Sequence, residues 1–539
     1  MEAAGQFDYI VVGAGTAGCV LANRFSKNPD NRVLLIEAGG KDDYVWIHIP
    51  VGYLYCINNP RTDWMFRTEA EAGLNGRSLI YPRGKVLGGS SSINGMIYMR
   101  GQERDYQQWA ELTGDDSWRW EQVLPLFKKS EDHHGGDAEF HGKGGEWRVE
   151  KQRLSWEILD AFRSAAAEVG IPNSDDFNRG NNEGCGYFDV NQKRGVRWNA
   201  SKAFLKPAAN RPNLTIMTGC QVQKLVIRND EQGKRCTGVE FTGGGRSWFA
   251  ESVKETVLAA GAIGSPQILQ LSGIGDAAHL QQVGVDVVHE LPGVGGNLQD
   301  HLQIRSAFRI TGAKTLNKMA NSLIGKARIG LEYAMFQSGP MSMAPSQLGA
   351  FTRSDASQAT PNLQYHVQPL SLEKFGDPLH DFPAFTASVC NLRPTSRGHV
   401  RIASNDAAAA PKIVPNYLTT PEDRKIAADS LKLTRKIIAA PSLQKYQPEE
   451  MKPGVQFQTE EELARAAGDI GTTIFHPVGT CKMGRVEDAL AVVDSNLRVI
   501  GINGLRVADA SIMPTITSGN TNSPTVMIAE KAARSILGK

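Results

Sequence analysis

Several features are missing from this sequence, and each absence argues against a class of protein. No run of about 18 or more apolar residues occurs, so we expect no transmembrane helix. The N-terminal segment has no basic stretch followed by an apolar one, so we expect no secretory signal and a cytoplasmic location. Basic and acidic residues number 59 and 57 and form no block of like charge, so nucleic acid is not an expected partner. Peripheral contact with a membrane stays open.

Cysteine is sparse and scattered along the chain. There are seven cysteines, an odd number, and no CxxC pair occurs. This pattern is typical of reduced thiols and argues against a disulfide framework or a zinc site. Cys481 lies close to His476 in sequence, but such a cysteine is more often a small buried hydrophobic residue than a nucleophile.

Signs of a metal site or of repeats are also weak. The segment EDHHGGDAEFH contains His133, His134 and His141 without the ligand spacing of a metal centre. We therefore expect a solvated loop there, and no bound metal. No internal repeat or low-complexity tract occurs, which argues against a solenoid.

What the sequence does contain, near its N-terminus, is a strand–turn–helix unit. Residues 7–12 (FDYIVV) are typical of a buried strand, and Gly13, Gly15 and Gly18 then form G-x-G-x-x-G at the start of a helical stretch. A second buried strand ends at Glu37, 19 positions after Gly18. This context predicts a dinucleotide-binding fold with a pyrophosphate at the helix N-terminus and ribose hydroxyls at Glu37. The carboxylate disfavours NADP, and a purely structural glycine turn is the weaker alternative.

A second glycine- and serine-rich run, residues 81–101, indicates a cofactor larger than NAD. The far end of a larger cofactor must also be held by backbone, which glycine and serine permit. The candidate contacts are Arg83 and Lys85 for phosphate charge, Gly88, Gly89 and Ser90 for close backbone approach, and Asn94 for a ring edge.

With these segments and three further motifs, the sequence resembles the glucose–methanol–choline (GMC) family of FAD-dependent oxidoreductases. The further motifs are GAIGSPQILQLSGIG, LPGVGGNLQDH and GLRVADASIMPTITSGNTNSPTVMIAEKAA, which begin at Gly261, Leu291 and Gly504. The motifs follow in the family's order from Phe7 to about Leu537, and the central region is the least distinctive.

The resemblance implies an α/β fold (α+β overall) with two domains. A Rossmann-like FAD-binding domain is expected from the discontinuous segments 1–155, 200–305 and 465–539. Residues 156–199 and 306–464 are expected to form a substrate-binding domain. Alternating runs such as LQYHVQPL and AFTASVCNLRP predict an antiparallel sheet there, and apolar residues at helical spacing predict helices that cover it.

The resemblance also carries over a set of residues expected to contact FAD. They are Gly13, Gly15, Thr16, Ala17, Gly18, Glu37, Ala38, Arg83, Gly88, Gly89, Ser90, Asn94, Gly95, Val222, Ala260, Gly261, Asp509, Ala510, Asn520 and Thr521. Val222 is expected to hold adenine through its backbone, and Asp509 with Ala510 to contact the ribityl chain and pyrophosphate. A turn-forming role for Asp509 is an alternative that can hold at the same time. Some relatives link FAD to a histidine where this chain has Ile93, so non-covalent FAD is expected.

His476, in the mostly apolar run TTIFHPVGTCKMG, is the candidate catalytic base. Taken alone, such a histidine is more often a core imidazole that is bonded to a carbonyl group. The resemblance instead places His476 and Asn520 against the flavin, on the substrate side. Oxidation of an alcohol requires loss of the hydroxyl proton and transfer of a hydride to flavin N5. A neutral imidazole can accept that proton, and Asn520 can position the same oxygen.

Gln347, Phe475 and Ile474 are the residues expected to shape the substrate site. Choline-oxidising relatives look as though they carry a glutamate where SQLGAF supplies the neutral Gln347. The expected substrate is therefore a neutral primary alcohol with an alkyl, aryl or polyether tail.

The electron acceptor is expected to be a quinone or a dye, because HPVGTCKMG looks more like the bacterial dehydrogenases than the fungal oxidases. An oxidase that uses O2 and a choline or polyol dehydrogenase stay open as alternatives. A flavin lyase or photodecarboxylase is more remote, because both His476 and Asn520 are present. The sequence does not indicate an oligomeric state.

Overall fold

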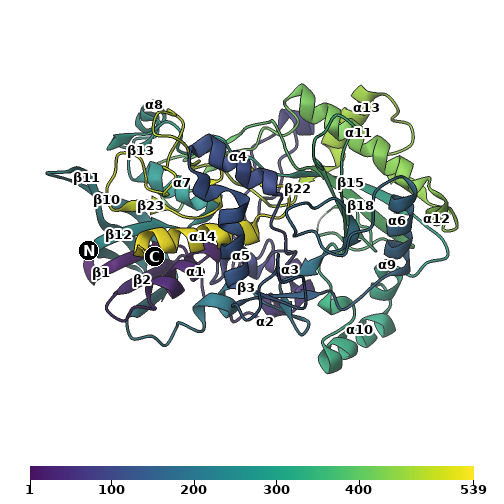
Figure 1. Cartoon of the computed structure of the whole chain (residues 1–539), viewed down its shortest axis with the longest axis horizontal. Coiled ribbons are helices and arrows are strands. Elements are labelled where there is room, and N and C mark those ends of the chain that lie inside the picture. The colour runs from purple at the N-terminus through teal and green to yellow at the C-terminus, as the bar shows by residue number, and fades with distance from the viewer. Residues whose placement is uncertain (375, 539) are drawn as a thin grey trace.

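The computed structural model describes residues 1–374 and 376–538, and its first large sheet is built around the N-terminal strand (Figure 1). β1 (Glu2–Val12) pairs in parallel with β2 (Val33–Glu37) on one side and with β12 (Arg246–Leu258) on the other. The sheet is completed by β9 (Leu214–Thr218), β10 (Cys220–Asp230), β11 (Gly233–Gly243) and β23 (Leu505–Val507). The C-terminal part of the chain thus returns to the sheet in which the N-terminal strand lies.

Helices connect and cover this sheet. α1 (Thr16–Phe25) joins β1 to β2, α7 (Gly261–Leu271) follows β12, and α14 (Asn522–Leu537) lies against α1. Because Val12 and Leu258 are paired at the ends of parallel strands, the turns after β1 and β12 lie side by side. The expected strand–turn–helix unit and the α/β fold are confirmed.

The second large sheet is antiparallel, as the alternating runs predict. Its strands are β5 (Gly184–Tyr187), β15 (Leu302–Arg309), β16 (Leu348–Thr352), β17 (Leu363–Gln368), β18 (Ala384–Asn391), β21 (Glu449–Lys452) and β22 (Gly471–Thr473). The helices α6 (Glu157–Glu168), α11 (Pro421–Ile438) and α13 (Glu460–Ile470) pack on this unit. β22 belongs to the segment 465–539, which was expected in the FAD-binding domain, but it pairs with β15 of the second sheet. Part of this segment therefore belongs to the second sheet. The exact domain boundaries stay a prediction.

Shorter elements fill the space around the two sheets. The remaining helices are α2 (Val45–His48), α3 (Tyr53–Cys56), α4 (Glu103–Thr113), α5 (Trp120–Ser130), α8 (Ala277–Gln282), α9 (Leu316–Ala320), α10 (Leu323–Phe336) and α12 (Pro441–Gln444). The remaining strands are β3 (Glu131–His133), β4 (Trp147–Lys151), β6 (Asp189–Val190), β7 (Gln192–Lys193), β8 (Val196–Arg197), β13 (Ile274–Gly275), β14 (His289–Glu290), β19 (His399–Arg401) and β20 (Lys412–Val414). Across the described residues, every helix is too short or too polar to cross a bilayer.

The cysteines have the environment that the sequence predicts. All seven are buried and free of disulfide bonds. Burial raises the pKa of the Cys481 thiol well above its ordinary value, with a further contribution from Asp509. A thiol held in its protonated form is a poor nucleophile, so Cys481 acts as a small buried hydrophobic residue.

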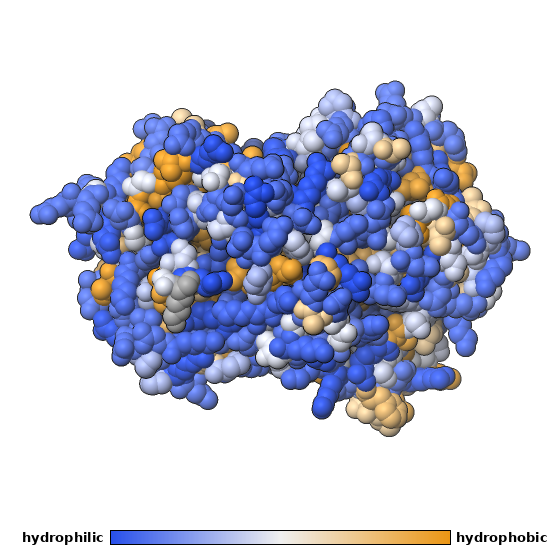
Figure 2. Space-filling view, viewed as in Figure 1, coloured by the Kyte–Doolittle hydropathy of each residue, from blue (hydrophilic) through white to orange (hydrophobic). Residues whose placement is uncertain are grey.

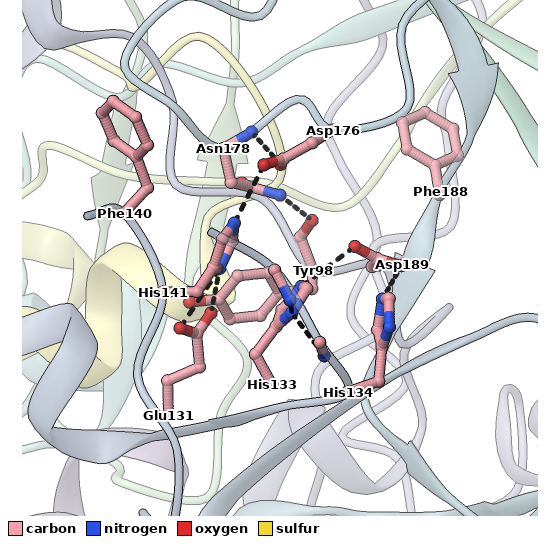
Figure 3. Close-up of polar contacts among 12 residues, drawn as sticks. Tyr98, Glu131, His133, His134, Phe140, His141, Asp176, Asn178, Phe188 and Asp189 are labelled. Atoms are coloured by element: carbon pink, nitrogen blue, oxygen red, sulfur yellow. Dashed lines mark hydrogen bonds and ion pairs between the residues drawn. The ribbon is translucent and has the colours of Figure 1, made fainter. Parts of the chain in front are cut away.

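The three histidines of residues 131–141 do not lie in a solvated loop, which corrects our expectation (Figure 3). His133 and His141 are buried and His134 is partly buried. β3 runs beside β4 and carries the segment into the interior. The partners that satisfy the rings include Asp176 and Asp189, which lie far along the chain and were not visible in the local pattern.

His141 is held between two carboxylates. Its Nδ1 lies 3.1 Å from Glu131 Oε1 and its Nε2 lies 2.9 Å from Asp176 Oδ2. Burial acts to lower the pKa of His141, but the hydrogen bonds to Asp176 and Glu131 outweigh it and raise the pKa. Arg100 Nη2 lies 2.8 Å from the other oxygen of Glu131. The result is a buried network of opposite charges.

The same cluster holds two groups of side chains whose ligand atoms lie within 4.8 Å of one another, close enough for a metal ion. The hydrogen bonds of these side chains indicate a network of ion pairs and argue against a metal site. His133 Nδ1 accepts from the Gly136 amide at 2.7 Å, so its Nε2 carries the proton that it donates to Asp189 at 3.2 Å. His141 needs both ring protons for its two carboxylates, and Arg100 places a cation beside Glu131. We interpret the cluster as an ion-pair network that holds residues 131–141 against the rest of the protein.

We predict that His141→Gln lowers the free energy of unfolding by about 3–5 kcal/mol, the usual cost of breaking a buried ion pair. The folded-state pKa of His141 is raised, so its contribution is complete below the pKa of the unfolded state and is lost as pH rises through the folded-state pKa. The stability difference between wild type and variant should therefore shrink as pH rises above about 6.5, the ordinary pKa of histidine, in urea unfolding. His399→Gln is the matched control, because burial lowers the pKa of that ring and no carboxylate of the described residues raises it, so its stability difference should not shrink as pH rises. A difference that stays constant with pH would count against the ion-pair network.

Candidate functional site

A cavity of about 930 Å³ extends from the glycine turn after β1 to the second sheet. The turns after β1 and β12 line one end through Gly13, Gly15 and Gly261. β15 and the residues that follow β22 line the other end. One cavity is thus lined both by the glycine-rich turns that are expected to bind the cofactor and by the segment that contains the expected base.

Glycine is required at several positions of the first turn. A Cβ on Gly18 would lie 1.8 Å from the carbonyl oxygen of Gly13, so only glycine lets α1 pack this closely. Gly13 has a φ of 97°, and a Cβ there would lie 2.7 Å from the carbonyl oxygen of Ala259. Gly261, with a φ of 76°, is open, since no atom lies within 4 Å of its added Cβ. The two turns form a backbone cradle with free space above it.

The N-terminus of α1 is available to an anion. Gly15 is the N-cap residue, and no side chain caps the first turn of this helix. The first amide groups of a helix have no partner within it and carry a partial positive charge, which favours a phosphate group. Thr16 and Ala17 of the same turn line the cavity.

Glu37 closes this end of the cavity. Its carboxylate accepts hydrogen bonds from the amides of Ala14 and Gly39, each at 2.8 Å. Burial raises the pKa of Glu37 to about 7, against the lowering effect of these two bonds. The carboxylate is held rigidly, and its remaining acceptor positions suit hydroxyl groups.

All of the residues predicted to contact FAD line this cavity except Gly18 and Gly88. Gly18 lies behind the turn, in contact with Gly13. Gly88 donates its amide proton to the Ala14 carbonyl at 2.8 Å and so joins the second glycine-rich run to the first. The contacts with FAD themselves stay predictions.

Arg83 lines the cavity and also makes hydrogen bonds within the protein, while its expected contact with a phosphate group stays a prediction. Its Nη2 donates to the carbonyl of Phe475 at 2.6 Å, and its Nε donates to the carbonyl of Pro82. Burial lowers the pKa of Arg83. The guanidinium therefore supports the segment that contains His476.

His476 lies in a chain of hydrogen bonds that fixes its tautomer. His301 Nε2 lies 3.2 Å from the carbonyl of Leu392, which can only accept, so this nitrogen carries the proton. His301 Nδ1 is then an acceptor, and the Nδ1 of His476, 3.1 Å away, must donate to it. The lone pair of His476 is left on Nε2, 3.1 Å from the Nδ2 amide of Asn520. These proton positions follow from the bonding pattern.

Burial keeps His476 neutral. The residue is 8% exposed, and burial, with the nearby His301, His366 and Arg83, lowers its pKa well below the ordinary value. An imidazole that is unprotonated at neutral pH and has a directed lone pair is a competent proton acceptor.

The carboxylate of Asp300 anchors both histidines. Its Oδ1 accepts the backbone amide protons of His301 at 2.9 Å and His476 at 2.8 Å. Its Oδ2 accepts from the hydroxyls of Thr473, Tyr81 and Tyr417. Burial raises the pKa of Asp300, and these hydrogen bonds oppose the rise.

The expected substrate residues are not all brought together. Ile474 and Phe475 line the cavity, and Phe475 has a φ of 69°, a strained value for a non-glycine residue. Gln347 does not line the cavity, and it is buried with both polar atoms of its amide unpartnered. The expected contact between Gln347 and the substrate has no support in this geometry.

Gln303, Arg305 and His366 also line the substrate end, and none of them was predicted from the sequence. Gln303 and Arg305 are two residues apart on β15 and therefore share one face of the strand. Burial lowers the pKa of Arg305, and among the described residues no carboxylate contributes to it. Burial lowers the pKa of His366 to about 3, and its Nε2 has no partner. The alternation of polar and apolar residues in LQIRS was the signal for the first two.

Comparisons with known proteins agree with the motifs. Two family models, both described as GMC oxidoreductase, match residues 7–303 and 394–529. An alcohol dehydrogenase [acceptor] from Pseudomonas putida is 40% identical, over 99% of this chain and 96% of its own. An oxygen-dependent choline dehydrogenase from Photobacterium profundum is 41% identical, over 99% and 93%. A formate oxidase from Aspergillus oryzae, studied for the modification of its FAD, superposes with a TM-score of 0.90 at 25% identity, over 100% of this chain and 99% of its own.

Proposed function

This chain belongs to the GMC oxidoreductase family, and on that premise we propose that it uses FAD to oxidise a primary alcohol to an aldehyde. The observation that carries the proposal is the directed lone pair of His476, which shares one cavity with an open glycine cradle. When bound, FAD supplies the acceptor for the hydride.

The residues at the glycine end suit FAD. The uncapped N-terminus of α1 would hold the pyrophosphate, and Glu37 would accept hydrogen bonds from ribose hydroxyls. Gly261 leaves room for close approach of the cofactor, since an added Cβ would meet nothing within 4 Å. Val222 lines the same end and would contact adenine through its backbone.

We predict that the flavin is bound without a covalent link. Ile93 lines the cavity where some relatives carry a linking histidine, and an aliphatic side chain cannot form that bond. Acid precipitation of the yellow protein should release the flavin into the supernatant. A yellow pellet under a colourless supernatant would show that another residue forms the link.

The residues around His476 divide the work of proton transfer. The neutral imidazole accepts the hydroxyl proton at Nε2, and Asn520 positions the same oxygen through its amide. Gln364 Nε2 donates to Asn520 Oδ1 at 3.2 Å, which turns the Asn520 NH2 group towards His476. His301 acts through His476: it accepts the Nδ1 proton and so keeps the lone pair on Nε2.

We predict that His476→Ala lowers the rate of flavin reduction by about 10²-fold or more, the scale of a lost general base. The flavin content should not change. Asn520→Ala should lose less, because it removes a positioning group and leaves the base. His301→Ala should shift the pH dependence of the rate, because the tautomer and the pKa of His476 are no longer fixed. Reduction of the His476→Ala protein at the wild-type rate would rule out a role for this imidazole as the base.

The charge at the substrate end favours a neutral alcohol over choline. Arg305 places a guanidinium in the cavity wall, and no carboxylate in the described part of the chain pairs with it. A quaternary ammonium group would be taken out of water next to a like charge, which is costly. An alkyl, aryl or polyether alcohol meets no such penalty, and Ile474 and Phe475 offer it apolar surface.

We therefore predict higher catalytic efficiency for 1-butanol, benzyl alcohol or a short polyethylene glycol than for choline. Arg305→Met, or Gln303→Glu on the same strand face, should raise the efficiency for choline relative to 1-butanol by about 10-fold, since about 1.4 kcal/mol corresponds to that factor. Arg309→Met is the matched control, because Arg309 lies on the same strand, is exposed and lines no part of the cavity. Choline as the best of the four substrates for the wild-type protein would overturn this assignment.

We propose a quinone or dye as the electron acceptor. The support is the HPVGTCKMG pattern, together with likeness to a relative named alcohol dehydrogenase [acceptor]. The relative named oxygen-dependent choline dehydrogenase keeps O2 as the alternative acceptor. Reoxidation of the reduced protein in air at the turnover rate would favour the oxidase.

A further inference from the structure

Helix α10 (Leu323–Phe336) turns an apolar face to solvent. Of its 14 residues, Ile329 is the buried one. Its largest apolar side chains are well exposed: Leu323 by 85%, Ile324 by 82%, Phe336 by 63%, Leu331 by 59% and Met335 by 59%. Figure 2 shows tan and orange atoms gathered at the lower right edge, over the place where Figure 1 shows α10.

Three of the exposed residues share one side of the helix, and Leu323 and Phe336 extend the apolar surface to its two flanks. Ile324, Leu331 and Met335 are seven and four residues apart, which places them on one face. Ile329 points to the opposite side and packs against the protein. A helix on a protein surface normally buries its apolar face, so α10 has the reverse orientation. A contiguous exposed apolar patch is typical of an interaction surface.

Exposed basic residues lie in α10 and in the segment just before it. The segment 311–336 contains Lys314, Lys318, Lys326 and Arg328 but only one acidic residue, Glu332. The four basic side chains are exposed, and the ion pairs of the described residues include none of them. The whole chain has a net charge of only +2, so the local excess of three positive charges is distinctive.

The apolar surface continues across the mouth of the cavity. Val45, Leu54 and Tyr55, in and beside α2 and α3, are exposed by 57%, 44% and 52%. Leu54 and Tyr55 line the cavity from one side, and Lys326 and Ile329 of α10 line it from the other. The 3₁₀ turn Pro50–Gly52 before α3 contacts the turn Pro340–Ser342 after α10, which brings the two rims together.

We propose that the docking face, formed by α10 and the α2–α3 segment, binds the surface of a membrane that contains anionic phospholipids. The apolar side chains would enter the interface, and the basic side chains beside them would contact the headgroups, as in interfacial amphipathic helices. The mouth of the cavity would then face the bilayer. This inference goes beyond the proposed function and does not depend on it.

The charges favour a lipid surface over a second copy of the chain. In a two-fold dimer through α10, Arg328, near the middle of the helix, would lie close to its own copy, and like charges would repel. An anionic surface instead attracts every basic residue of the segment. The patch also lies on a projecting edge of the molecule in Figure 2, which suits insertion into a yielding surface.

The test is cosedimentation of the full-length protein with phospholipid vesicles. Wild type should bind vesicles of phosphatidylcholine with about 30% phosphatidylglycerol at least about 10-fold more strongly than vesicles of phosphatidylcholine alone, and salt should weaken this binding. Leu323→Ser/Ile324→Ser/Phe336→Ser should reduce binding by about 10-fold or more. Val486→Ser/Leu490→Ser is the matched control, because these side chains are 65% and 54% exposed elsewhere, and it should bind as wild type does.

A second variant tests the proposal even if the apolar variant fails to fold. Lys318→Gln/Arg328→Gln keeps the apolar face and should lose the preference for anionic vesicles, with an unchanged thermal unfolding transition. Wild-type protein that stays in the supernatant would overturn the proposal, as would equal binding by wild type and the apolar variant. Size-exclusion chromatography of wild type and the apolar variant shows whether a second copy of the chain covers this face. If the apolar variant converts a dimer to a monomer and vesicle binding does not change, a second copy covers the face and the proposal fails.

Discussion

The buried carboxylate of Asp300 is the interaction on which the site depends. It accepts the backbone amides of His301 and His476 and the hydroxyls of three further residues. His301 lies just before β15, and His476 lies just after β22. The Asp300 carboxylate therefore holds together the start of one strand and the end of the other. A buried charge held by five donors is costly to disturb, because each lost donor leaves the carboxylate less compensated. The geometry of the base is therefore set by backbone contacts.

The cavity forms because segments far apart in the sequence lie side by side in the first sheet. β1 and β12 are parallel neighbours, so their following turns meet and form the cradle. β23 joins β12 from the C-terminal side and brings Asp509 to the same edge, where it accepts from the amide of Gly261 at 2.8 Å. Asn520, only eleven residues later, reaches His476 on the substrate side. A single C-terminal segment thus spans both ends of the cavity.

The sequence predicted those parts of the site that a local pattern specifies. The strand–turn–helix around Gly13 and Gly18 has fixed spacing, and steric contact with Gly13 explains why Gly18 must be glycine. Glu37 follows from the same spacing. The antiparallel second sheet followed from alternation with a period of two.

Other features depend on packing that the sequence does not reveal. The local pattern around His133 and His141 suggested solvent, because Asp176 and Asp189 come from distant segments. The sequence placed Gln347 at the substrate, whereas Gln303 and Arg305 of β15 line the cavity. Residues 323–336 are rich in apolar side chains, but only the fold shows that the largest of them are exposed.

The pH dependence of flavin reduction by an excess of a primary alcohol, followed anaerobically by rapid mixing, tests the central claim most directly. The pKa of His476 is lowered well below its ordinary value by burial, with help from the neighbouring histidines and Arg83. The rate should therefore be constant around neutral pH and fall only in acid, with a midpoint below about 6.5, and deuterium at the alcohol carbon should slow it. A rate that keeps rising through a midpoint well above neutrality would show that a group other than the neutral His476 accepts the proton.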